Sequence, residues 1–185
     1  MVNLGRHGVS ICPAVRPLAN PPTLPRTMHP FVIRCAALLL AAFTTLAHAA
    51  EPVSTGWLNG VAIGGKDTVS YYSADVKASH QVVEGNSTFT VQYLGAPWRF
   101  ASKASADRFA ANPAAYVPQY NGHCSNALSQ GEGLISTNGS VWEFFGDKLH
   151  LFYAERGRQR WLTGDWQAFR QQADKAWQDI LAARR

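Results

Sequence analysis

The sequence predicts an α+β domain: a small antiparallel sheet of hairpins with short helices and a C-terminal amphipathic helix packed on it. Three observations predict this class. Residues 87–94 alternate between apolar and polar side chains, two apolar runs within residues 141–153 flank a glycine turn, and residues 166–181 repeat apolar side chains at steps of three and four. The chain therefore contains both the alternating apolar pattern of strands and the three- and four-residue spacing of helices. It has no internal repeat.

The first hairpin is predicted from the alternating residues 87–94, which place three apolar side chains on one face of a strand. A break at residues 95–97 then leads to a partner strand at residues 98–100. Ser102 is placed to cap a helix that runs through Ala111 and stops before an Asn-Pro pair, because a residue preceding proline avoids the α region.

The second hairpin is predicted at residues 141–145 and 148–153. These runs flank Gly146-Asp147, a two-residue loop with glycine first, as a type II′ turn requires. The C-terminal helix covers residues 166–181, with Asp165 as its N-cap. Its apolar face, which carries two tryptophans, is expected to cover the sheet.

The front of the chain has a different character. Residues 1–27 contain five prolines and no apolar periodicity, so we expect them to be unstructured or to be an upstream misreading of a start at Met28. From Met28 a short basic segment precedes the apolar run of residues 35–46, which is too short to cross a bilayer of roughly 30 Å. The run ends in Ala47-His48-Ala49, the small-x-small pattern of a signal peptidase site.

We therefore expect residues 28–49 to be a signal peptide and residues 50–185 to be a single mature domain, periplasmic or secreted, with no membrane anchor after cleavage. A membrane anchor and a buried N-terminal helix are the alternatives. The mature part carries 13 basic and 12 acidic residues, so the basic precursor gives no reason to expect a nucleic-acid partner. It keeps one cysteine, Cys124, and cannot form an intramolecular disulfide.

Several separated blocks of this domain resemble the YHS domain, and more closely the exported bacterial proteins described as YHS domain-containing (seleno)proteins. The resemblance spans roughly residues 58–181. The blocks are Gly60 to Asp67, Tyr71-Tyr72, Gly95-x-x-Trp98-x-Phe100-x-Ser102, Phe109, Asn112-Pro113, Tyr116, Pro118 to Cys124 and Ser129-Gln130-Gly131.

The resemblance implies a site at Cys124. Metal-associated YHS domains carry cysteines at positions that match Ser70, Ala101 and Ser105, none of which supplies a thiolate here. In the exported subgroup the retained sulfur, sometimes replaced by selenium, matches Cys124. That implies redox or soft-ligand chemistry at this position of the domain.

Cys124 is also the most reactive side chain by its own chemistry, because a thiolate is both a nucleophile and a soft metal ligand. A small buried side chain without function is the alternative. His123 and His150 are the histidines that would join it, although residues adjacent in an extended chain face opposite sides. A transition metal ion would be held by Cys124 and His150.

Asp67, Tyr71 and Tyr120 belong to the blocks of the resemblance and are expected to support this site; a helix cap is the alternative for Asp67. Arg156 and Arg160 share a helical face and would meet an anion or solvent. The sequence holds no nucleophile elbow, no H-E-x-x-H motif and no informative pair of carboxylates, which disfavours a hydrolase.

These residues suggest two functions that depend on Cys124 and one alternative that does not. The first is an exported, non-catalytic binding module that holds a transition metal or small ligand near Cys124. The second is a single-cysteine thiol redox protein that depends on an external thiol reductant. The alternative is an interaction domain in which Cys124 is inert.

Overall fold

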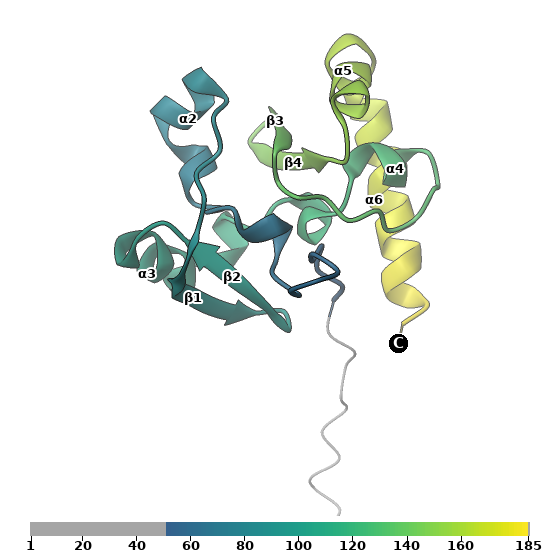
Figure 1. The fold of residues 1–185 in the computed structure, drawn as a ribbon. Helices are drawn as coiled ribbons and strands as arrows, with labels where there is room; N and C mark the ends of the chain where they lie inside the picture. Colours follow the sequence, from purple (N-terminus) through teal and green to yellow (C-terminus); the bar gives the residue numbers. More distant parts are fainter. Residues whose placement is uncertain (1–50, 185) are drawn as a thin grey trace, which may run out of the picture. The chain divides into compact units, whose positions relative to one another are not determined.

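The structure is a computed structural model that describes residues 51–184, and it contains the predicted first hairpin as β1 (Asn86–Tyr93) and β2 (Ala96–Phe100) (Figure 1). Tyr93 pairs with Ala96, so the loop has two residues where three were predicted. Both loop residues, Leu94 and Gly95, have positive φ angles of 51° and 77°. This is the backbone of a type I′ turn, which matches the twist of the flanking strands.

The helix after this hairpin is α3 (Lys103–Ala111), and it begins and ends as predicted. Ser102 Oγ accepts a hydrogen bond of 3.1 Å from the backbone N–H of Ser105. The helix places Phe109 against Trp98 and Phe100 of β2. These rings form part of a first hydrophobic core.

The second hairpin consists of β3 (Val141–Phe145) and β4 (Lys148–Phe152). Gly146 has a φ of 66° and Asp147 does not have a positive φ, as predicted for a type II′ turn. Side chains of β4 alternate between two cores: Leu149 and Leu151 enter the first core, whereas Phe152 enters a second. The hairpin is therefore covered on both faces.

Three helices surround the second core: α4 (Ser125–Ser129), α5 (Glu155–Thr163) and α6 (Trp166–Ala182) (Figure 1). The predicted cap of the C-terminal helix is present, because Asp165 Oδ1 accepts from the N–H of Ala168. Helix α6 packs along α4 and buries Ala173 and Trp177. Its Trp166 ring lies 5.6 Å from that of Phe145, which confirms that the helix packs on the hairpin.

The fold class is α+β as predicted, but the described residues hold two separate two-stranded sheets, where one small sheet was expected. Other segments cover the edges that would otherwise join. Ala62 N–H donates to the carbonyl of Pro97 on β2, and Cys124 forms an isolated parallel bridge with Leu151 of β4. The β2 edge and the β4 edge are therefore each paired with another segment of the chain.

Several short elements have no counterpart in the sequence prediction. They are η2 (Ile63–Gly65), η3 (Ser70–Tyr72), α2 (Ala74–Ser79), η4 (Pro113–Ala115) and η5 (Gln119–Gly122). The predicted signal peptide at residues 28–49 and the segment 1–27 lie outside the described residues. Within residues 51–184 no helix has the length and apolar character needed to cross a bilayer.

Candidate functional site

The backbone before Cys124 is fixed in an unusual conformation. Tyr120 and Asn121 in η5 have positive φ angles of 56° and 50°, followed by Gly122 at 85°. A Cβ at Gly122 would lie 2.4 Å from Cγ2 of Ile63, so glycine is required both by the backbone and by the space. The chain then enters an extended segment at Cys124.

Cys124 is held on both sides of the extended segment. Its N–H donates a hydrogen bond of 2.9 Å to the carbonyl of Ile135, and its other neighbour is Leu151 of β4. Directly after it, the chain turns into α4, of which Cys124 is the N-cap. The position of the sulfur is thus set by a strand on one side and a helix start on the other.

The sulfur accepts two backbone hydrogen bonds. The N–H of Ala127, in the first turn of α4, lies 3.5 Å from Sγ, and the N–H of Tyr153, just past β4, lies 3.3 Å from it. Sγ therefore meets one main-chain donor from the start of α4 and one from the segment after β4. The hydrogen bonds to Sγ among the described residues come from the backbone alone.

A cavity of about 400 Å³ lies beside the sulfur. Cys124 is only 4% exposed, yet it lines this cavity together with Ala127 and Tyr153, the residues that donate to Sγ. Arg156 and Glu132 bring one charge of each sign, and Asn126, Gln130, Ile135, Ala154 and Gly157 complete the wall. The volume is within the range of small-molecule sites.

His150 lies beside the cysteine segment, but its imidazole makes its hydrogen bond with Ser125 and not with Cys124. Its Nδ1 is 3.0 Å from Oγ of Ser125, and its Nε2 has no hydrogen-bond partner among the described residues. The imidazole is fully buried between the rings of Tyr120, Phe145 and Trp161. Burial lowers the pKa of His150 to about 3, with a smaller effect of the Arg170 charge, so the ring is neutral at physiological pH.

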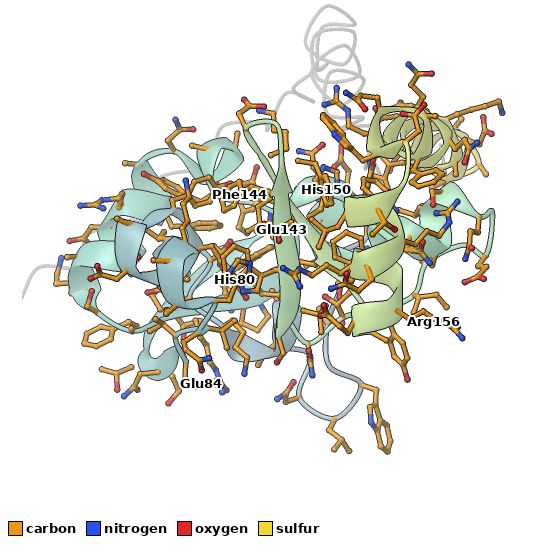
Figure 2. All side chains as sticks on the ribbon, turned by 90° about the horizontal axis from the view of Figure 1, so that it is seen from above. His80, Glu84, Glu143, Phe144, His150 and Arg156 are labelled. Carbon is orange, nitrogen blue, oxygen red and sulfur yellow. The ribbon has the colours of Figure 1, made fainter. Side chains whose placement is uncertain are left out.

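His123 contacts Tyr120 and Trp177 and is not among the residues that line the cavity. Its Nδ1 donates to the carbonyl of Tyr120 at 3.0 Å, and its ring lies 6.1 Å from that of Trp177. Burial lowers the pKa of this imidazole, opposed in part by the backbone hydrogen bond. Neither histidine lines the cavity, and Figure 2 shows His150 well apart from Arg156, which does.

Tyr71, Tyr120 and Asp67, which were predicted to support the site, make their hydrogen bonds elsewhere in the fold. Tyr71 Oη donates 2.7 Å to the carbonyl of Gly139, and Tyr120 Oη donates 2.9 Å to Oδ1 of Asp174. Burial raises the pKa of both phenols far above the usual value, which keeps these donors protonated. Neither tyrosine lines the cavity.

Asp67 is a fully buried carboxylate that joins two loops. Its Oδ1 accepts from the N–H groups of Val69 and Ser70, and its Oδ2 accepts from the N–H of Ala101 at 3.0 Å. The first pair closes a turn ahead of η3 and is not the helix cap offered as the alternative, because the N-cap of η3 is Val69 and has no side-chain cap bond. The third bond ties this turn to the loop between β2 and α3.

The sequence pointed to Cys124 but missed most of its surroundings. Arg156 was expected to meet an anion or solvent on a helix face, and the two N–H donors to the sulfur carry no side-chain signature. Among residues 51–184 no group of three or more His, Cys, Asp or Glu side chains is placed to hold a metal ion. No family model, curated protein or solved structure matches this chain.

Proposed function

We propose that this chain is an exported YHS-like binding module that holds a small polar ligand in the cavity beside Cys124. One observation carries the proposal: the only cysteine of the described residues lines a 400 Å³ cavity while its sulfur accepts two backbone N–H bonds. A cysteine that only fills space in a core would be surrounded by apolar side chains. It would not line a cavity together with charged groups.

The chemistry of the wall indicates the kind of ligand. Arg156 provides a fixed positive charge that forms no ion pair with another described residue, and Glu132 provides a negative one. Asn126 and Gln130 add amide groups, although Asn126 Oδ1 already accepts from Arg160 and Gln130 Nε2 already donates to Glu132. A molecule of a few polar groups, with an anionic group toward Arg156, would satisfy this wall.

A transition metal ion near Cys124 is the narrower form of the same proposal. A thiolate is a good ligand for soft metals, and His150 keeps one unpartnered nitrogen. However, the imidazoles of His123 and His150 are engaged with Tyr120 and Ser125 inside the second core. The side chains around the cavity favour an organic ligand over a metal.

Two observations support the YHS-like and exported parts of the proposal. Ser70 and Ala101, which match metal-ligand positions of the family, both donate backbone N–H groups to one carboxylate, that of Asp67. Positions of one ancestral site would be expected to converge in this way. The pattern of residues 28–49 supports export.

Ligand-observed NMR with a library of small carboxylates and amides tests the binding function. We expect some of these compounds to bind the wild-type chain, and to lose about tenfold or more in affinity in Arg156→Ala because a charged contact is removed. Arg108→Ala, on the exposed face of α3, is the matched control and should bind as wild type does. Equal binding by both variants, or no binding at all, would contradict the proposal; parallel calorimetry with Zn²⁺ and Cu⁺ tests the metal form.

The two N–H bonds to Sγ favour a second candidate function, thiol redox chemistry. In this reaction the Cys124 thiolate attacks a disulfide such as oxidised glutathione, forms a mixed disulfide and releases one glutathione thiolate. An external thiol then reverses the step. Mass spectrometry of the Cys124 peptide after incubation with oxidised glutathione would show the adduct, and its absence after prolonged incubation would exclude this function.

A further inference from the structure

A second cavity, of about 310 Å³, lies between α2 and the β3–β4 hairpin. It shares no lining residue with the cavity beside Cys124. Its wall is aromatic: Tyr72, Trp142 and Phe144 line it, and the Tyr72 and Phe144 rings meet edge to face at 5.1 Å. Aromatic faces in this arrangement attract cations through their quadrupoles.

A cation of the chain itself already lies over these rings. Lys77 Nζ is 4.4 Å from the centroid of Phe144 and 5.9 Å from that of Tyr72. Lys77 is an exposed residue near the end of α2, so its side chain can leave the rings without unfolding the helix. The lysine shows where an ammonium group is stabilised.

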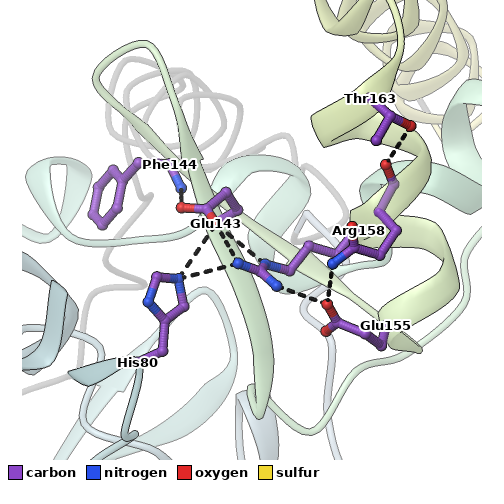
Figure 3. Close-up of polar contacts among 7 residues, drawn as sticks. His80, Glu143, Phe144, Glu155, Arg158 and Thr163 are labelled. Atoms are coloured by element: carbon purple, nitrogen blue, oxygen red, sulfur yellow. Dashed lines mark hydrogen bonds and ion pairs between the residues drawn. The ribbon is translucent and has the colours of Figure 1, made fainter. Parts of the chain in front are cut away.

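The walls of this cavity are held rigidly. The guanidinium of Arg158 donates to Oε2 of Glu143 at 2.6 Å, and His80 Nε2 lies 3.3 Å from the same oxygen (Figure 3). The His80 ring stacks on Trp142 with the centroids 4.5 Å apart and the planes 13° from parallel. A prearranged wall reduces the ordering cost of binding.

The charges of the lining also suit a cation. Apart from Lys77 and His80, the lining carries two carboxylates, Glu143 and Asp147, and no positive group. Burial, and after it the negative charge of Asp147, raises the pKa of Tyr72 to about 12. The Asp147 charge therefore acts on a residue of the aromatic wall. An anionic ligand would meet repulsion here.

We propose that this cavity is a binding site for an organic ammonium group, and that Lys77 occupies it when no ligand is bound. The ligand ammonium would take the place of Lys77 Nζ over Phe144 and Tyr72, with Asp147 at the edge of the site. The lysine then acts as an internal competitor that weakens binding of every external cation by the same factor.

Choline is the probe, and its neutral analogue with carbon in place of the quaternary nitrogen is the control ligand. By calorimetry we expect Lys77→Met to bind choline about fivefold more tightly than the wild-type chain does, because the internal competitor is gone. Lys175→Met, at an exposed pair on α6, should leave the affinity unchanged. In both proteins the neutral analogue should bind at least about fivefold more weakly than choline does.

Two further variants locate the site. In the Lys77→Met background, Phe144→Leu should lower choline affinity about tenfold by removing an aromatic face, and Asp147→Asn, on an exposed turn, should lower it about threefold without affecting folding. The proposal is overturned if Lys77→Met does not bind choline more tightly, if the neutral analogue binds equally well, or if neither site variant weakens binding.

Discussion

The backbone N–H of Tyr153 donates a hydrogen bond of 3.3 Å to Sγ of Cys124, from a position 29 residues further along the chain. The same residue has a side chain that is 71% exposed and lines the cavity. One residue thus connects the buried sulfur with the protein surface. Cys124 is buried, but it belongs to neither hydrophobic cluster and lines the cavity instead.

Asp67 is expected to stabilise the fold through its three N–H bonds. Asp67→Ala should lower the free energy of unfolding by about 2–4 kcal/mol, because it leaves buried donors unpaired. Asp67→Asn should not restore the loss, since its amide group would turn a donor toward either Ala101 or the Val69 and Ser70 N–H groups. Urea denaturation measures both effects.

The control for these variants is Asp107→Asn, which breaks an exposed ion pair with Lys103. It should change the free energy of unfolding by less than about 1 kcal/mol. If Asp67→Ala lowered the free energy of unfolding no more than this control does, the hydrogen bonds of Asp67 between the two loops would not stabilise the fold.

Gly122 is expected to tolerate no side chain. Gly122→Ala should lower the free energy of unfolding by about 2–4 kcal/mol, because the Cβ would meet Ile63 at 2.4 Å and φ is 85°. Gly131 also has a positive φ, 74°, but open space around it, so Gly131→Ala should cost only about 1 kcal/mol. A similar loss in both variants would show that the contact with Ile63 is not restrictive.

His150 is expected to make stability depend on pH. Its folded pKa of about 3 lies below the ordinary value of 6.5, so between these values the unfolded chain binds a proton that the folded chain does not. The free energy of unfolding should therefore fall as pH falls from about 6.5 toward 3, with a slope of up to about 1.4 kcal/mol per pH unit from this group.

The variant that tests this is His150→Gln, which removes the titrating group and should reduce the slope measured by urea denaturation at several pH values. Phe169→Leu is the control, because its ring packs on Trp161 of the same core and its replacement removes no proton site. It should lower stability at every pH and leave the slope unchanged. A His150→Gln slope equal to that of wild type would rule out the neutral buried imidazole.

Local sequence patterns predicted the two hairpins, the caps at Ser102 and Asp165 and the C-terminal helix, because each depends on neighbouring residues. The prediction of His150 as a partner of Cys124 depended instead on how β4 pairs with a distant segment. The segments do lie side by side, but the imidazole meets Ser125, one residue beyond the cysteine. A pattern of alternation gives the face of a strand and not the residue opposite.

The surroundings of the sulfur were beyond prediction for a different reason. Both donors to Sγ are backbone N–H groups, which every residue type except proline supplies. The backbone before the extended segment is left-handed at Tyr120 and Asn121, and although asparagine is enriched in that region, a tyrosine gives no such signal. Only the cysteine itself stood out.

The most direct test of the account is alkylation of Cys124 in the native full chain by iodoacetamide, followed by peptide mapping. If the sulfur is reached through the cavity, Cys124 reacts without denaturant, and Ala154→Trp, which fills the cavity, slows the reaction roughly tenfold or more. If Cys124 reacts only after unfolding, the sulfur is enclosed, and if it reacts at the same rate in both proteins, the reagent does not reach it through the cavity. Either result contradicts the proposed site.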